Sequence, residues 1–289
     1  MNASLGRIRA IASTTLLELT RLRVFYVLIL FALVLIVSST FLARISFQQE
    51  LQVTKDISLG AINFFLSLLA IVATAQVLPR DMEDRVIYSV LAKPVSRFDY
   101  IIGKFLGVIA LLIISLVAMS VLCFIVLHFR AEAAWREANQ QMTQLAPQQP
   151  SGGGQAVRGA GLSLELVVAL TLILAKCIIL AAATLCISAF ATSSIFTITA
   201  MAMIYIIGNL EGIVRDYWLQ EHPAGWVARV FLAFVAFVFP DLQAFDISNL
   251  VAGGVAMTGP FMVKLLSLGA LYAFSYLLLA IAIFYQREL

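Results

Sequence analysis

Residues 105–127 read FLGVIALLIISLVAMSVLCFIVL, an apolar run of 23 residues without a single charge. A helix needs about 20 consecutive apolar residues to cross the hydrocarbon core of a bilayer. The chain has 289 residues, of which 62% are hydrophobic and only 12% are charged, whereas charged residues make up about 25% of a soluble domain. We therefore expect an all-α polytopic membrane protein that forms a single transmembrane domain over residues 1–289.

Runs of similar length recur on both sides of this one. They predict six transmembrane helices, at residues 24–43, 59–78, 105–127, 164–186, 194–210 and 262–285. A further apolar piece, residues 226–239, contains Arg229 and is followed by Pro240. A piece of this length is too short to cross a bilayer comfortably, so we expect a re-entrant or interfacial segment between the fifth and sixth spans. If it does span, the C-terminus lies on the opposite side of the membrane.

The distribution of Lys and Arg predicts the orientation of the chain. The side that would hold the N-terminus, residues 80–104 and the C-terminus carries ten of these residues, against seven on the other side. Nine of the ten lie beside the first three spans, where positive charge influences orientation most strongly. We therefore expect both termini and residues 80–104 to lie in the cytoplasm.

The residues before the first span have an amphipathic pattern. Apolar or small side chains follow helical spacing at Leu5, Ile8, Ala12, Thr15, Leu16 and Leu19. This pattern predicts an N-terminal amphipathic helix at the inner membrane surface. The alternative is a simple extension of the first span. The long loop at residues 128–161 has two parts. A short polar helix is predicted for AEAAWREANQQM, and a flexible segment for LAPQQPSGGGQAVRGAG.

The most heavily charged connection lies between the second and third spans, at residues 80–104 (RDMEDRVIYSVLAKPVSRFDYIIGK). Pro79 followed by acidic residues predicts a helix start, because helix N-termini favour negative charge. Pro94 prevents that helix from continuing. Ser96 and Asp99 form an S-x-x-D capping signature for a second helix, which enters the third span. We therefore expect a short amphipathic helix, a tight break and a new helix.

This connection resembles that of a known family. IYSVLAKPVSR at residues 87–97 and IIGKFLG at residues 101–107 follow an acidic residue, and they closely resemble the membrane subunits of ABC-2-type transporters. The Thr that is usual in this motif is Val86 here. Residues 188–197 resemble the family's linker between the fourth and fifth spans, and FPDLQAFD at residues 239–246 resembles its P-(N/D)-L-x-x-F-(N/D) stretch. The resemblance covers nearly the whole chain.

The resemblance implies a permease, the membrane-spanning subunit of an ABC transporter in the inner membrane of a bacterial cell. The chain has no G-x-x-x-x-G-K-[ST] motif, so we expect ATP hydrolysis on a separate cytoplasmic ABC ATPase subunit. The other expected partners are a second permease copy, in a homodimer or a heterodimer, and membrane lipid, with no nucleic acid and no cofactor. An exporter is favoured. The alternative is a non-transporting membrane anchor that docks an ABC-type ATPase for signalling or envelope machinery.

The same resemblance places the contact with the ATPase in a coupling helix between the second and third spans. The residues expected to couple to the ATPase are Glu83, Asp84, Arg85, Ile87, Tyr88, Leu91, Lys93, Pro94, Arg97, Gly103 and Lys104. Charges at the rim of such an interface set register and partner choice more than affinity. The alternative for each charge alone is an ordinary solvated anchor at the membrane boundary.

The sequence gives no support to an integral-membrane enzyme. His128 and His222 flank different spans, and no acidic or histidine cluster accompanies either of them. Cys123, Cys177 and Cys186 fall within apolar runs without a CxxC or Cys/His spacing. We therefore expect buried packing cysteines, and no catalytic, cofactor-binding or metal-binding residues.

Several polar side chains lie inside the predicted spans, and Lys176 and Asn209 are two of them. Lys176 lies near the middle of the fourth span and Asn209 near the end of the fifth. A charged group within a membrane is costly, so it pairs with another group, reaches the interface or lines a pathway. We favour structural pairing or an inner-leaflet position for Lys176, and an interhelical hydrogen bond for Asn209.

Overall fold

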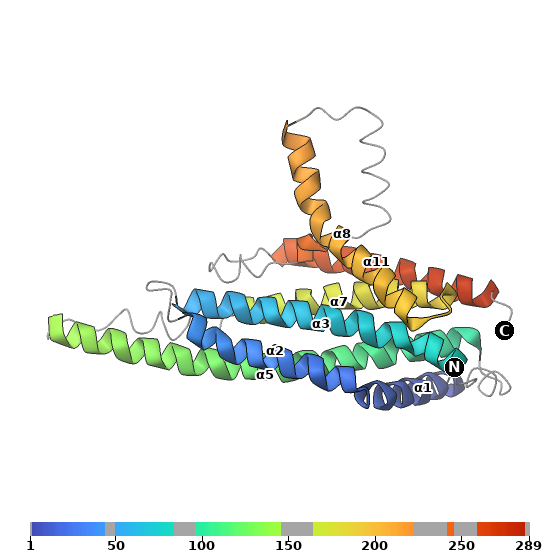
Figure 1. Cartoon of the computed structure of the whole chain (residues 1–289), viewed down its shortest axis with the longest axis horizontal. Helices are drawn as coiled ribbons and strands as arrows, with labels where there is room; N and C mark the ends of the chain where they lie inside the picture. Colours follow the sequence, from blue (N-terminus) through green and yellow to red (C-terminus); the bar gives the residue numbers. More distant parts are fainter. Residues whose placement is uncertain are drawn as a thin grey trace.

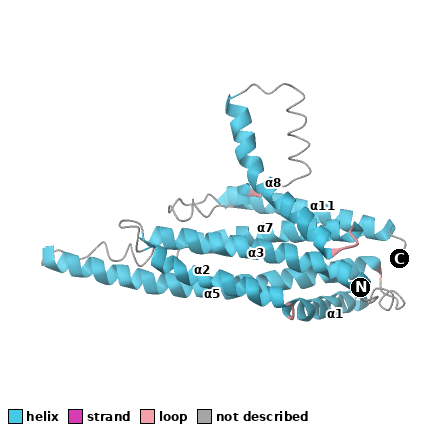
Figure 2. Cartoon of the chain, viewed as in Figure 1, coloured by secondary structure: helices cyan, strands magenta, loops and turns pink. Residues whose placement is uncertain are grey.

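The computed structural model describes residues 2–43, 50–83, 96–145, 164–221, 242–245 and 259–286. Within these ranges the chain is helical, without any strand (Figure 2). The elements are α1 (Asn2–Thr20), α2 (Arg23–Ala43), α3 (Glu50–Glu83), α5 (Arg97–Leu145), α7 (Leu164–Phe190), α8 (Ser194–Glu221), the 3-10 helix η1 (Gln243–Phe245) and α11 (Gly259–Gln286). The predicted all-α class is confirmed for this part of the chain.

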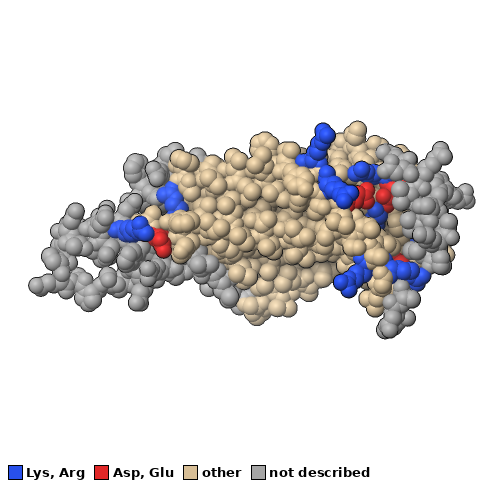
Figure 3. All heavy atoms as spheres, turned by 90° about the horizontal axis from the view of Figure 1, so that it is seen from below, with Lys and Arg blue, Asp and Glu red and all other residues tan. Residues whose placement is uncertain are grey.

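Five described helices are long and apolar enough to cross a membrane, namely α2, α3, α5, α7 and α11. They contain the predicted first, second, third, fourth and sixth spans. The predicted fifth span lies in α8, whose apolar part, Ser194–Leu210, is shorter than the other five. The charges on the face shown in Figure 3 gather at the two ends of the molecule, with an uncharged band between them. This distribution is that of a protein that spans a bilayer.

The helices α2, α3, α5, α7 and α11 lie side by side, and the chain runs back and forth along them, whereas the C-terminal part of α8 projects away from the bundle (Figure 1). Both termini lie at the same end of the bundle (Figure 1). The C-terminal end of α3 and the N-terminal end of α5 lie at this end too, as does the short turn between α7 and α8. The predicted placement of the termini and the charged connection on one side is therefore consistent with the helix arrangement.

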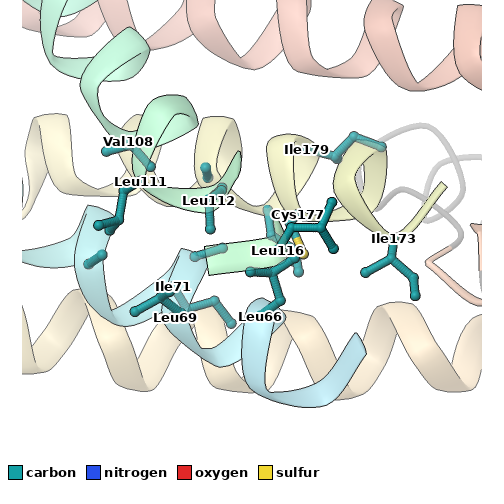
Figure 4. Packing of buried hydrophobic residues seen from close by; sticks show 14 of the residues in the cluster. Leu66, Leu69, Ile71, Val108, Leu111, Leu112, Leu116, Ile173, Cys177 and Ile179 are labelled. Carbon is teal, nitrogen blue, oxygen red and sulfur yellow. The ribbon is translucent and has the colours of Figure 1, made fainter. Parts of the chain in front are cut away.

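The core lies between α3, α5 and α7. Leu66 and Leu69 of α3, Leu112 of α5 and Ile173 of α7 belong to this core (Figure 4), and Ile179 of α7 extends it to Gly269 of α11. Lipid tails are as apolar as leucine, so helices in a membrane associate through close van der Waals contact rather than through exclusion of water. One face of α11 packs closely against the bundle in this way, and its buried residues recur at helical spacing. They are Leu265, Gly269, Ala273, Ala280 and Phe284.

The short helix η1 inserts into this bundle from outside the long helices. Its residue Phe245 is fully buried, and a Cβ atom on Gly269 of α11 would lie 3.1 Å from the Phe245 ring. The preceding Leu242 is buried as well, and its N–H donates to the carbonyl of Gly208 in α8 at 3.1 Å. The described residues of this stretch, 242–245, therefore supply two apolar anchors between α8 and α11.

All three cysteines are free and buried, as predicted for packing residues. The predicted N-terminal helix is confirmed as α1. Arg21 and Leu22 interrupt the helix before α2, so α1 is not a continuous extension of the first span. Its placement on a membrane surface stays a prediction, since α1 packs mainly against α5.

Two boundary predictions are wrong. Pro79 does not begin a new helix, because α3 continues through it to Glu83. Membrane helices tolerate proline where packed neighbours satisfy the freed backbone, and the next two residues are held by side-chain contacts described below. The polar segment after the third span is not a separate helix either, because α5 runs unbroken for 49 residues. No Gly or Pro lies between Gly107 and Pro147 to end it.

Three other predictions fall outside the described residues. They are the short helix with its break at residues 84–95, the flexible segment at residues 146–161, and the re-entrant or interfacial segment at residues 226–239. These three stay predictions.

Candidate functional site

The N-terminus of α5 is fixed by a cap and by contacts with α1. The backbone N–H of Asp99 donates to Ser96 Oγ at 3.0 Å, which confirms the capping role predicted for Ser96. The Asp99 carboxylate points to α1, where it accepts a hydrogen bond from Ser4 Oγ at 3.4 Å and pairs with Arg7 at 3.5 Å. The cap therefore also connects the start of α5 to α1.

One turn further along α5, Lys104 joins three helices. Its Nζ lies 2.7 Å from the Asp81 carboxylate of α3 and 3.5 Å from the Glu18 carboxylate of α1. The Tyr100 hydroxyl donates to the same Asp81 carboxylate, and Lys104 Nζ lies 5.8 Å from the centre of the Tyr100 ring. Arg80 Nε lies 3.7 Å from the other carboxylate oxygen of Glu18.

These contacts form one cluster at the end of the bundle that holds both termini. We name it the anchor cluster: Arg7, Glu18, Arg80, Asp81, Asp99, Tyr100 and Lys104. Its three cations and three carboxylates give a formal charge of zero. Asp81, Asp99, Tyr100 and Lys104 are each at most 7% exposed. Removing one partner of a buried ion pair leaves an uncompensated charge and costs about 3–5 kcal/mol.

Two glycines make the approach of α1 to α5 possible. A Cβ atom on Gly103 would lie 2.8 Å from Ile11 Cβ. A Cβ atom on Gly107 would lie 2.9 Å from the backbone oxygen of Ala12 and 2.7 Å from Thr15 Cβ. This Gly-x-x-x-Gly pair leaves room for the α1 backbone, as small residues do at close helix crossings in membranes. The close approach brings Glu18 of α1 within reach of Lys104.

The start of α5 is tied to the end of α11 as well. The Arg97 guanidinium donates to the carbonyls of Phe284 and Tyr285, at 3.2 and 3.0 Å. These carbonyls belong to the last turn of α11, which has no further intrahelical donors for them. The rings of Tyr100 and Phe284 stack with their centres 5.9 Å apart. Both helix ends that flank residues 84–95 are therefore held by neighbouring helices.

The structure describes the contacts of three of the predicted coupling residues. Arg97 caps α11, Gly103 contacts α1, and Lys104 is at the centre of the anchor cluster. Glu83 is the last residue of α3, and its side chain is not among those described. Asp84, Arg85, Ile87, Tyr88, Leu91, Lys93 and Pro94 lie outside the described residues.

Sequence reasoning missed the partners of these residues. Arg7, Glu18, Asp81 and Tyr100 were not singled out as functional residues. One signal was present, since Glu18 is the only carboxylate in residues 1–49. An isolated acid among arginines, before an apolar span, indicates a paired group rather than a solvated one. The Gly103-x-x-x-Gly107 spacing was a second signal, for a close helix contact.

Lys176 forms a separate polar contact inside the bundle. It is fully buried in α7, donates to Asn209 Oδ1 of α8 at 3.2 Å, and lies 5.5 Å from the centre of the Tyr205 ring. The Asn209 amide donates in turn to the Tyr205 carbonyl at 2.8 Å. The interhelical hydrogen bond predicted for Asn209 is confirmed, and Lys176 is its partner; a structural rather than a pathway role of Lys176 stays a prediction. This contact joins α8 to the core.

Among the described residues, no three His, Cys, Asp or Glu side chains come together as metal ligands would. The long apolar helices, the uncharged band and the charged ends define a polytopic helical membrane protein. A sequence model of ABC-2 family transporter proteins matches residues 10–215. The match covers more than half of the chain, and the chain therefore belongs to the ABC-2 transporter family, whose members are membrane components of transport rather than catalysts. A comparison with curated proteins gave no match.

Proposed function

We propose that this chain is the permease subunit of an ABC exporter, and that a separate cytoplasmic ATPase drives it. In this proposal α2, α3, α5, α7, α8 and α11 are the six spans, and both termini lie in the cytoplasm. A second permease copy, identical or different, completes the translocation pathway. Residues 84–95, with Glu83 before them, contact the ATPase.

The observation that supports this proposal best is the anchor cluster. Residues 84–95 join α3 to α5, and the cluster fixes the last turn of α3 to the first two turns of α5 through the Lys104–Asp81 pair. Arg97 fixes the same end of α5 to α11. A connection with loosely held ends would absorb a displacement by bending. One with firmly held ends transmits it to the helices.

The arrangement suits a two-state mechanism. A nucleotide-driven change in the ATPase would displace the connection, and the paired charges would move α1, α3 and α5 together. Packed interfaces switch between discrete arrangements rather than deforming continuously. The ATPase shifts the equilibrium only by the difference in its affinity for the two states.

This mechanism assigns different tasks to the predicted coupling residues. Those from Glu83 to Pro94 touch the partner. Gly103 and Lys104 act from inside the bundle as positioning residues, because one contacts α1 and the other is nearly buried. Arg97 positions α5 against α11.

The first test is association with the ATPase that co-purifies with the chain. The charge reversal Glu83→Arg with Arg85→Glu should abolish co-purification and the stimulation of ATP hydrolysis. The matched control is Arg136→Glu, an exposed arginine of α5 at the opposite end of the bundle. Unchanged association of the double variant would remove the case for this contact.

The second test separates an exporter from a membrane anchor. The purified complex is placed in vesicles with the ATPase sites outside, and ATP-dependent accumulation of amphipathic candidate cargo is measured. Accumulation that stops when Lys104 is replaced, while ATP binding persists, supports a permease with the proposed coupling. ATP hydrolysis without accumulation of any cargo would favour the anchor.

A further inference from the structure

A cavity of about 510 Å³ lies where α1 ends and α2 begins. Its walls include Leu17 and Glu18 near the end of α1, Arg21 and Leu22 in the break between the two helices, Arg23 at the start of α2, and Arg80 of α3. The volume falls in the range of pockets that bind small ligands, about 300–1,000 Å³. Residues from three helices and the break between α1 and α2 therefore line an open, ligand-sized pocket at the charged end of the bundle.

The cavity is positively charged. Three arginines and one glutamate line it, which gives a formal charge of +2. The glutamate, Glu18, is already compensated by Arg80 at 3.7 Å and Lys104 at 3.5 Å. Arg21 and Arg23 are exposed, and neither pairs with a carboxylate in the part of the chain that the structure describes. Two guanidinium groups are thus available to an anion in the cavity.

An apolar surface begins beside these arginines. Val24, Val27, Leu30 and Phe31 of α2 are each between 39% and 61% exposed, and Val24 directly follows Arg23. Since α2 is long and apolar enough to cross a membrane, we expect these exposed side chains to face lipid acyl chains. This would place the cavity where the hydrocarbon core meets the headgroups, with its cations at that boundary.

We propose that this cavity binds the phosphate headgroup of an anionic phospholipid, whose acyl chains lie along the exposed face of α2. Guanidinium groups bind phosphate oxygens in pairs of parallel hydrogen bonds. The N-terminal end of α2 adds the positive end of its helix dipole. A free phosphate offers the same oxygens, but a lipid also covers the apolar surface beside them, which favours the lipid as occupant. The proposal does not depend on coupling to an ATPase.

A ligand bound in the cavity would also contact the anchor cluster. Arg80 lines the cavity and pairs with Glu18, which pairs in turn with Lys104. A phosphate that contacts Arg80 shares it with Glu18. Arg80 and Glu18 therefore link a bound lipid to the helix ends that flank residues 84–95.

The test measures lipid binding to the purified full-length chain in detergent by native mass spectrometry. Phosphatidylglycerol and phosphatidylcholine with identical acyl chains are titrated separately, and inorganic phosphate is titrated as a competitor. We expect one saturable phosphatidylglycerol site. Arg21→Gln should weaken it about fivefold to tenfold, as should Arg23→Gln. The matched control is Arg9→Gln, which removes an exposed arginine of α1 that does not line the cavity.

The outcomes are distinct. Equal weakening by Arg9→Gln and Arg21→Gln would show diffuse attraction between a basic helix and anionic lipid, and would overturn the site. Equal affinity for phosphatidylcholine would overturn the recognition of anionic charge. Inorganic phosphate that displaces the lipid at equal concentration would overturn the lipid as occupant. Thermal unfolding of each variant shows whether it is folded, and the two arginine variants test the site independently if one of them fails.

Discussion

Replacing Lys104 by Met tests the anchor cluster most directly. Methionine keeps most of the apolar volume of the lysine side chain and removes its charge. The change leaves Asp81 with the Tyr100 hydroxyl as its remaining partner in the cluster, and leaves Glu18 with Arg80. The Asp81 carboxylate then stays buried without its nearest cation.

The two ion pairs that this change removes contribute differently to stability. The Lys104–Asp81 pair spans 2.7 Å between side chains that are 8% and 5% exposed, so its loss costs about 3–5 kcal/mol. The Lys104–Glu18 pair spans 3.5 Å and Glu18 is 35% exposed, so solvent screening reduces its share to less than about 1 kcal/mol. At about 2 °C per kcal/mol for a chain of this size, Lys104→Met should lower Tm by roughly 6–10 °C.

The assay is thermal unfolding in detergent, followed by circular dichroism. The double variant Lys104→Met with Asp81→Asn should be more stable than the sum of the two single losses predicts, by about 1–3 kcal/mol, because no buried charge is left alone. Lys264→Met is the matched control, since Lys264 is exposed on α11. It should change stability by less than about 0.5 kcal/mol.

Two results would refute the reasoning. A loss below about 1 kcal/mol for Lys104→Met would mean that water reaches Asp81 and screens it. Strict additivity of the two single changes would mean that the two groups are not coupled.

Three further predictions concern the contacts around the cluster. Gly107→Ala should destabilise the chain by about 1–3 kcal/mol, because the new methyl group would meet the α1 backbone at 2.9 Å. Gly60→Ala, with nothing within 4 Å of the new Cβ atom, should be neutral or stabilising. Phe245→Ala should cost about 3–5 kcal/mol, since the ring is fully buried, whereas the exposed Phe274→Ala should cost little. Arg97→Gln should speed hydrogen exchange in the last turn of α11, because the guanidinium no longer binds its carbonyls.

Each of these has a clear contradicting result. Equal Tm values for the two alanine variants at glycine would mean that α1 does not approach α5 closely. A small loss for Phe245→Ala would mean that η1 does not insert between α8 and α11. Unchanged exchange in α11 after Arg97→Gln would mean that α5 and α11 are not joined at their ends.

Five of the six predicted spans correspond to described helices that are long and apolar enough to cross a membrane, because apolar run length alone predicts such helices. A bilayer needs about 20 apolar residues, and the run at residues 24–43 corresponds to α2 within one residue. The helix ends were not predictable in the same way. Pro79 was expected to start a helix, and it lies inside α3, because the residues that follow it are held by side chains from α1 and α5. A rule based on the residues next to a proline does not include contacts made by residues far away in the sequence.

The anchor cluster shows the same limit. Ser96 and Asp99 were recognisable as a cap, because a cap depends on residues three apart. The pairing of Asp99 with Arg7 joins residues that are 92 positions apart, and periodicity says nothing about such a contact. Lys104 was identified from the family motif and expected at a partner surface. Its burial follows from the glycines beside it, which let α1 cover that side of α5.

The charge balance of the cluster explains how so many charges lie beside an apolar bundle. A lone charge at this depth is costly, but each buried carboxylate here has a cation within 3.5 Å. Several members of this network share a partner, since Glu18 pairs with both Arg80 and Lys104, and Lys104 with both Glu18 and Asp81, so the loss of one member weakens more than one contact. The same property makes it a firm base for residues 84–95. The helices α1, α3 and α5 cannot separate at this end without breaking several ion pairs together, so a displacement of the connection favours joint movement of the three helices.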